Sequence, residues 1–217
     1  MSRQVVPKQR GCFITLEGVD GAGKSTHIPW LLKAIQQHFE VEVLHTREPG
    51  GTLLGESLRA LLLDHAMSAK TEALLMFAAR NEHIETCIEP ALAAGKWVVC
   101  DRFTDASYAY QGGGKALGQA AISTLEQWVH PDLQPDHTLL FDLDLAQANA
   151  RRTQARSPDR FEQESLAFFQ RVRKVYLERA KAQPQRFHII DTSVTIEAVR
   201  AQLTQVLQQL QNNFSQS

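Results

Sequence analysis

Short apolar runs alternate with longer amphipathic stretches along most of the chain. The apolar runs predict β-strands near residues 12–16, 41–45, 97–101, 137–142 and 187–191. The amphipathic stretches predict helices over residues 24–38, 53–63, 72–93, 117–129, 146–154, 162–182 and 195–211. This alternation is typical of an α/β fold in which helices cover both faces of a parallel sheet.

Two glycine clusters interrupt this rhythm, "EPGGT" at residues 48–52 and "YQGGGK" at residues 110–115. Glycine weakens the interior of helices and strands, so we expect both clusters in connections, with Gly112–Gly114 as flexible backbone. There are no internal repeats. The 217 residues suit one domain spanning the whole chain, with residues 1–10 as a frayed tail.

The composition narrows the class of protein without naming a function. Hydrophobic residues make up 43%, charged residues 22%, and the net charge is −1, so nothing suggests a protein that coats nucleic acid or an acidic membrane. No apolar run is long enough to cross a bilayer, and residues 1–10 lack the apolar core of a secretory signal. Cys12, Cys87 and Cys100 have no zinc spacing and are expected as reduced thiols in a cytoplasmic protein.

The stretch "LEGVDGAGKST" follows the first predicted strand. Its spacing, Gly18-x4-Gly23-Lys24-Ser25, is that of a phosphate-binding loop, in which backbone N–H groups at a helix N-terminus surround a polyphosphate. Lys24 would contact the β- and γ-phosphates, and the Ser25 hydroxyl would ligate Mg²⁺. The sequence therefore predicts a nucleotide site formed by Gly18, Val19, Asp20, Gly21, Ala22, Gly23, Lys24, Ser25 and Thr26.

A second strand end points to the same chemistry. The apolar run that begins at Trp97 stops abruptly at Asp101 and Arg102. Ligands in such sheets lie at the carboxyl ends of the strands, so both side chains should face the phosphate loop. Asp101 could ligate Mg²⁺ or organise its water shell, and the Arg102 guanidinium suits a phosphate.

These motifs together resemble those of bacterial thymidylate kinases. The segments that carry the resemblance lie between Phe13 and about Asp191 and occur in the family's order: "EGVDGAGKST", "TREPGG", "FAAR", "DRFTDASYAYQGGG" and "DRFEQE". The resemblance implies a nucleoside-monophosphate-kinase fold with a five-stranded parallel sheet, a short lid and a homodimeric state. It also implies transfer of the γ-phosphoryl group of ATP to dTMP, with Mg²⁺ as cofactor.

The resemblance further assigns residues to the acceptor nucleotide. It places Asp20 near the sugar and phosphate of the acceptor. It places Arg47 and Arg59 at the acceptor phosphate or sugar, where with Arg102 they would form a cationic socket that aligns the acceptor oxygen.

The base would be recognised by "MFAAR" and by the helix that follows Arg102. Phe77 and Arg80 share a helix face, and an aromatic ring can stack on thymine while a guanidinium donates to its carbonyl oxygen. The family often has an aromatic residue where this chain has Met76, so either Phe77 or Met76 lies against the base. The resemblance also puts Ser107 and Gln111 at the edge of the base. It puts the Tyr110 ring against the deoxyribose.

The polar stretch at residues 151–160 is expected to be the lid. Phosphoryl transfer needs positive charge at the equatorial oxygens of the transferred group, and the loop offers only Lys24. The resemblance implies that a lid arginine supplies the rest. The lid holds Arg151, Arg152, Arg156 and Arg160, of which Arg156 is the first candidate and Arg152 the second.

Two alternatives stay open at this point. A kinase of the same fold could act on another deoxynucleotide or on a deoxynucleoside. A GTP-binding switch would share the phosphate loop, but the base-reading NKxD motif of such switches is absent from the sequence.

Overall fold

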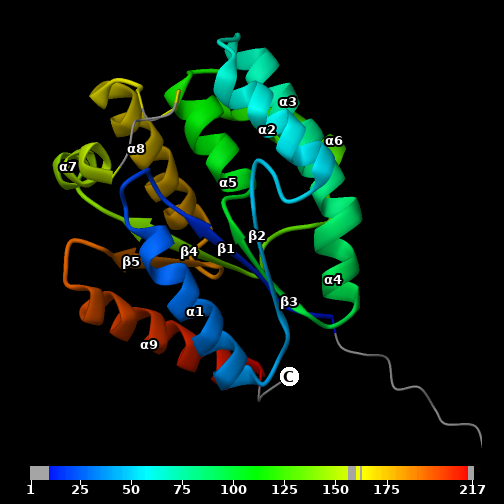
Figure 1. Ribbon diagram of the computed structural model, residues 1–217, viewed down its shortest axis with the longest axis vertical. Coiled ribbons are helices and arrows are strands. Elements are labelled where there is room, and N and C mark those ends of the chain that lie inside the picture. Colours follow the sequence, from blue (N-terminus) through cyan, green and yellow to red (C-terminus); the bar gives the residue numbers. More distant parts are fainter. Residues whose placement is uncertain (1–9, 156–159, 162, 215–217) are drawn as a thin grey trace, which may run out of the picture.

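A single parallel sheet of five strands forms the centre of the molecule (Figure 1). The computed structural model describes residues 10–155, 160–161 and 163–214, of which 152–155 and 213–214 are described by their backbone alone. The strands are β1 (Phe13–Glu17), β2 (Val43–Arg47), β3 (Trp97–Asp101), β4 (His137–Asp142) and β5 (Phe187–Asp191), in the order β2-β3-β1-β4-β5. The predicted α/β fold with a five-stranded parallel sheet is confirmed.

The register of the strands places the functional loops together. β1 is buried along its whole length and pairs with β3 on one side and β4 on the other. Leu16 lies opposite Asp101 on β3, and Arg47 on β2 also lies opposite Asp101. All strands are parallel, so the phosphate loop after β1 and the segments after β2 and β3 leave the sheet at one edge.

Nine α-helices and two π-helical segments surround the sheet in the described residues. α1 and α9 lie side by side on one face, while α8 packs with α5 on the other (Figure 1). α2 and α3 form a pair beyond the sheet edge. The bounds are α1 (Lys24–Phe39), α2 (Leu53–Asp64), α3 (Ala69–His83), η1 (Ile84–Ile88), α4 (Glu89–Ala93), α5 (Thr104–Ser107), η2 (Tyr108–Gly114), α6 (Gln119–Val129), α7 (Leu145–Ala155), α8 (Leu166–Ala182) and α9 (Ile196–Phe214). None of the described helices is both long and apolar enough to cross a membrane.

The glycine cluster at residues 110–115 is not the flexible connection that we expected. Residues up to Gly114 belong to η2, which continues α5 and packs against α8. A Cβ atom at Gly113 would meet Val175, and one at Gly114 would meet the Phe168 ring, both on α8. The glycines here permit a close approach between helices, which sequence punctuation alone does not distinguish from a loop.

Other predicted boundaries were wrong by a few residues, and local capping explains several of them. α3 begins at Ala69 rather than at 72 because the Ser68 side chain accepts a hydrogen bond from the Thr71 N–H. Ser165 caps α8 in the same way, so that helix begins at Leu166 rather than 162. β2 begins at Val43 rather than 41, after Glu40 ends α1 in a left-handed conformation with φ 53°.

Candidate active site

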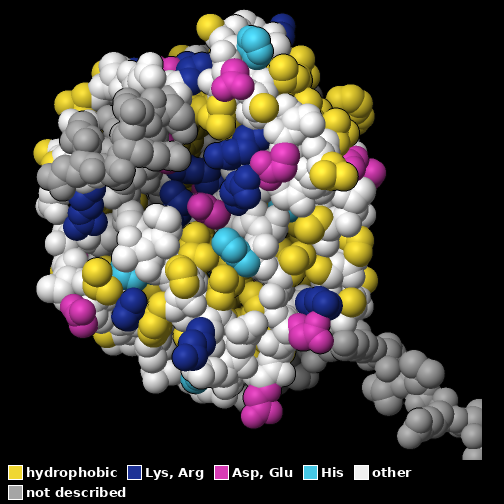
Figure 2. Space-filling view, viewed as in Figure 1, with side chains coloured by type: hydrophobic (Ala, Val, Ile, Leu, Met, Phe, Trp, Pro, Cys, Tyr) yellow, Lys and Arg dark blue, Asp and Glu magenta, His cyan; other side chains and the backbone are white. Residues whose placement is uncertain are grey.

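A cavity of about 610 Å³ opens where the strands end. Lys and Arg side chains gather in this hollow, as Figure 2 shows. Its walls come from the phosphate loop, β2, α2, α3, the segment after β3, η2 and α7. Among the lining residues are Asp20, Gly21, Ala22, Gly23, Lys24, Ser25, Thr26, Arg47, Arg59, Met76, Arg80, Asp101, Arg102, Ser107, Tyr110, Gln111, Arg151 and Phe161. Most residues predicted from the sequence therefore lie on one cavity.

The phosphate loop has the backbone geometry that its glycines permit. Gly21 and Gly23 have φ angles of 84° and 93°, in the left-handed region that favours glycine, and Gly23 is the N-cap of α1. The loop thus leads directly into the N-terminus of α1, and a helix N-terminus is the kind of site that binds anions. The Lys24 ammonium lies 3.3 Å from the Gly18 carbonyl and 3.9 Å from the Asp101 carboxylate. Burial and the neighbouring Arg102 charge lower the pKa of Lys24, so an anionic ligand would stabilise its charged form.

Arg102 lies at the centre of a partly buried hydrogen-bond network. Its backbone has φ 72°, which is uncommon for a residue with a side chain. One guanidinium nitrogen donates to the Gly18 carbonyl at 3.0 Å and to Tyr176 Oη at 3.2 Å. The other donates to Asp20 at 2.6 Å and to Tyr110 Oη at 3.0 Å. The network orients the guanidinium beside the loop before any ligand binds.

Asp20 is a direct partner of Arg102 in this network. Its second oxygen accepts a hydrogen bond from Tyr110 Oη at 2.8 Å. Burial alone would raise its pKa, but the charges of Arg102 and Lys24 outweigh burial and lower the pKa of Asp20 to about 2. The carboxylate stays charged at neutral pH and offsets part of the positive charge of the cavity.

Arg80 presents one unpaired donor group beside the cavity. Its Nε donates to Glu48 at 2.8 Å, and its Nη2 donates to the Ser107 hydroxyl at 3.1 Å. Its Nη1 is buried and has no hydrogen-bond partner among the described residues. A buried unpaired donor is costly, so Nη1 is suited to a carbonyl oxygen supplied by a ligand.

Phe77 is not on the cavity wall, contrary to its predicted place against the base. Its ring is 2% exposed, lies 4.5 Å beneath the Arg80 guanidinium and stacks on His130. Met76, one residue earlier, lines the cavity instead. The one-residue difference follows from helical geometry, because neighbouring side chains on α3 diverge by about 100°.

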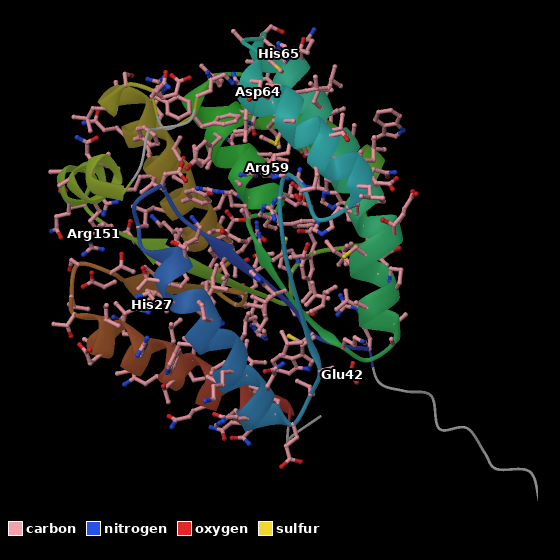
Figure 3. The ribbon with its side chains drawn as sticks, viewed as in Figure 1. His27, Glu42, Arg59, Asp64, His65 and Arg151 are labelled. Carbon is pink, nitrogen blue, oxygen red and sulfur yellow. The ribbon has the colours of Figure 1, made fainter. Side chains whose placement is uncertain are left out.

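The two other predicted acceptor arginines line the cavity from β2 and α2. Arg47 is exposed and pairs with Glu56 at 2.8 Å. Arg59 donates to the Pro49 carbonyl at 3.0 Å. Figure 3 shows Arg59 on α2 near the middle of the view and Arg151 on α7 at its left.

The predicted lid is described only in part. Arg151 lines the cavity, and its guanidinium donates to the Thr192 carbonyl at 3.0 Å. Arg160 is not among the residues that line the cavity. It donates to Glu72 at 2.7 Å and to the Leu62 carbonyl at 2.9 Å. Arg156 and the side chain of Arg152 lie outside the described residues, so their roles stay predictions.

Comparisons with known proteins match this arrangement. The family model described as thymidylate kinase matches residues 16–203. A thymidylate kinase of Bordetella pertussis is 60% identical over 201 residues, which are 93% of this chain and 96% of that protein. The chain belongs to the thymidylate kinase family.

Further relatives match over a similar share of the chain. A thymidylate kinase of Cupriavidus metallidurans is 58% identical over 198 residues, covering 91% of this chain and 98% of that protein. The crystal structure of the thymidylate kinase from Ehrlichia chaffeensis superposes with a TM-score of 0.76 at 36% identity, covering 92% of this chain and 99% of that one.

Within this thymidylate kinase family member, two buried groups escaped the sequence analysis. Glu17 lies inside β1, where it accepts hydrogen bonds from Tyr176 Oη and the Phe103 N–H, each at 2.7 Å. Burial and the Asp105 charge raise the pKa of Glu17 to about 8. The one feature of the sequence that could have indicated Glu17 is an acidic residue at the end of a mostly apolar strand. Tyr176 lies far along the chain on α8, and nothing in its local sequence indicates that it reaches Arg102.

Beside Arg80, Glu48 and His83 form a second such group, in which Glu48 also lines the cavity. Glu48 accepts from Arg80 and lies 3.0 Å from His83 Nδ1, whose Nε2 lies 2.6 Å from the Thr46 hydroxyl. Burial would raise the pKa of Glu48, but Arg80 and His83 lower it. This buried layer fixes the position of the Arg80 guanidinium, which holds Nη1 toward a ligand.

Proposed function

We propose that this protein transfers the γ-phosphoryl group of ATP to dTMP, giving ADP and dTDP. The observation that carries the proposal is the cavity itself, which joins a phosphate loop to Arg80 Nη1, a donor with no partner in the part of the chain that the structure describes. A kinase needs a donor site and an acceptor site that face each other across one space. Membership of a kinase family removes the GTP-binding switch from consideration.

The donor phosphates would be held by the phosphate loop and Lys24. Lys24 would stabilise the negative charge that develops on the oxygen between the β- and γ-phosphates during transfer. Asp101 and Ser25 fit Mg²⁺, since both line the cavity and Asp101 Oδ1 is buried with no hydrogen-bond partner among the described residues. A bound Mg²⁺ would neutralise charge on the phosphate oxygens.

The acceptor would lie in the same cavity, beside the phosphate loop. Arg102, Arg47 and Arg59 would bind its phosphate, and the Tyr110 ring would lie where a ribose 2′-hydroxyl needs room. Arg80 Nη1 would donate to O4 of thymine, with Ser107 and Gln111 at the base edge. These side chains orient the acceptor oxygen toward the γ-phosphate, which is most of what phosphoryl transfer requires of a protein.

A steady-state panel of acceptors tests this function. With ATP and Mg²⁺, dTMP should give the highest kcat/KM among dTMP, its ribonucleotide analogue, dUMP, dCMP, dAMP and thymidine. Thymidine should be the poorest pyrimidine, since it offers no phosphate to Arg102. A preference for dCMP, dAMP or thymidine would favour the alternative of a kinase for another deoxynucleotide or deoxynucleoside.

Arg102→Ala should raise the KM for dTMP by about tenfold to a hundredfold while the KM for ATP changes less than threefold. A charge-assisted contact to a phosphate is worth about 1.5–3 kcal/mol, and Arg102 contacts Asp20, which we expect near the acceptor nucleotide. Steady-state kinetics with each substrate varied in turn measures both constants. Arg173→Ala is the matched control because Arg173 pairs with Asp142 through two nitrogens away from the cavity. An equal rise in the KM for dTMP and the KM for ATP would assign Arg102 to the ATP side of the cavity.

We propose a homodimer as well, formed by the exposed apolar face of α2, α3 and α6. These helices adjoin one another, α3 contacting both α2 and α6. Five large apolar side chains on them are exposed: Leu53 93%, Leu54 51%, Leu61 45%, Leu74 48% and Trp128 80%. A second copy of this chain would cover such a patch without a further partner.

Trp128→Glu should therefore shift the protein from dimer to monomer in light scattering after gel filtration. A buried charge opposes association, and aromatic residues dominate interface energies. The control is Leu166→Glu, which places the same charge at an exposed apolar residue on α8, outside this face. A wild-type protein that is monomeric at micromolar concentration would contradict the dimer.

The proposal places the enzyme in the cytoplasm, where ATP is available and thiols stay reduced. Its three cysteines are free, with Cys12 and Cys100 buried. The single five-stranded sheet supports one kinase domain over residues 1–217, although residues 1–9 of the predicted tail lie outside the described residues.

A further inference from the structure

A buried carboxylate just outside the cavity connects the base-facing wall to the end of the lid. Glu72 lies in the first turn of α3 and is fully buried. One of its oxygens accepts a hydrogen bond from Gln111 Nε2 at 2.8 Å, and the other accepts from Arg160 Nη2 at 2.7 Å. Glu72 itself is not among the residues that line the cavity.

This contact decides which end of the Gln111 amide faces a ligand. A carboxylate paired with a guanidinium has acceptors only, so the amide group of Gln111 must turn its nitrogen to Glu72. Its Oε1 makes no hydrogen bond to the described residues, and Gln111 lines the cavity. The cavity therefore receives an acceptor from Gln111.

A donor lines the same cavity. Arg80 Nη1 is buried and unpaired within the described part of the chain, and Arg80 Nη2 contacts Ser107, four residues before Gln111. Thymine and uracil carry an acceptor at O4 and a donor at N3–H, which match this pair. Cytosine has the opposite pattern, with a donor at N4 and an acceptor at N3, so both contacts would be mismatched.

We propose that Glu72 is a specificity-determining positioning residue, which makes the cavity reject cytosine by locking the orientation of the Gln111 amide. The inference rests on the proposed function only in taking this cavity wall as the site of the acceptor base. If the amide turned over, Gln111 Oε1 would face the Glu72 carboxylate, and two acceptors at that distance repel each other. Arg160 holds the second oxygen and so keeps the carboxylate in place.

Glu72→Gln is the direct test, because glutamine has the same shape but offers a donor as well as an acceptor. The Gln111 amide can then adopt either orientation. We expect the ratio of kcat/KM for dTMP to that for dCMP to fall about tenfold or more. The ratio for dTMP to dUMP should stay within twofold, because these two bases share O4 and N3–H. A general loosening of the fold would change the dTMP/dCMP ratio and the dTMP/dUMP ratio alike, so the difference between them isolates the effect on cytosine.

Two further variants isolate the role of Gln111. Gln111→Ala should lower the dTMP/dCMP ratio at least as far as Glu72→Gln does, and it tests the idea even if Glu72→Gln does not fold. Adding Glu72→Gln to Gln111→Ala should change this ratio no further, since Glu72 acts through Gln111. Glu164→Gln is the matched control, as Glu164 pairs with Lys115 and does not contact Gln111.

Three results would overturn the inference. They are an unchanged dTMP/dCMP ratio in Gln111→Ala, equal changes in the dTMP/dCMP and dTMP/dUMP ratios in Glu72→Gln, and a full effect of Glu72→Gln in the Gln111→Ala background. A wild-type enzyme inactive with dTMP would instead contradict the proposed function, so the two failures can be distinguished.

Discussion

Replacing Arg156 with alanine is expected to lower kcat by about 10³-fold or more, with ATP affinity changed only a few-fold. An arginine that contacts the transferred phosphoryl group stabilises charge that is greatest in the transition state, so its loss affects turnover rather than binding. Two other arginines of the predicted lid already have protein partners. Arg160 is bound to Glu72 and Leu62, and Arg151 to the Thr192 carbonyl.

The measurement is a set of single alanine variants at Arg151, Arg152, Arg156 and Arg160, each assayed for kcat and for ATP affinity. Arg160→Ala and Arg151→Ala serve as controls from the same lid and should lose much less turnover than Arg156→Ala. A largest loss at Arg152 would assign the catalytic role to Arg152 in place of Arg156. Turnover within a few-fold of wild type in all four variants would mean that the lid supplies no catalytic charge.

Lys24→Ala is expected to lower kcat by about 10²–10³-fold in a protein that stays folded. The ammonium lies within the loop, 3.3 Å from the Gly18 carbonyl, and a buried cation next to phosphates acts strongly because little water screens it. Lys24 is the first residue of α1, and its ammonium lies 3.9 Å from Asp101 at the end of β3, so the change removes one charge at the edge of the sheet and leaves the strand pairing intact.

The Lys24 prediction is checked by single-turnover kinetics together with circular dichroism and thermal unfolding. Lys96→Ala is the control, since Lys96 is an exposed lysine that pairs with Glu42 far from the loop. Near-normal turnover of a folded Lys24→Ala protein would contradict the assignment of the donor site.

The sheet and the phosphate loop could be predicted because their signals are local. Five apolar runs gave the five strands, and the spacing from Gly18 to Ser25 defined the loop directly. Asp101 and Arg102 were found for the same reason, as a charged pair at the end of an apolar run. Each of these features depends on residues close together in the chain.

The contacts that fix the site could not be predicted because they join distant segments. The Arg102 guanidinium is held by Asp20, 82 residues away, and by Tyr176, 74 residues away. Glu72 meets Gln111 and Arg160 only in the folded chain. Phe77 was misplaced for a different reason: a single-residue step on α3 separates the core from the cavity, and composition does not tell the two faces apart.

The central claim, that one cavity holds the donor and acceptor nucleotides end to end, is tested most directly with a bisubstrate ligand. The ligand is adenosine joined to thymidine through a chain of five phosphates, titrated calorimetrically. The account predicts one molecule bound per protein chain, tighter than ATP or dTMP alone and displaced by either nucleotide. Binding of two molecules per chain, or displacement by ATP alone, would contradict it.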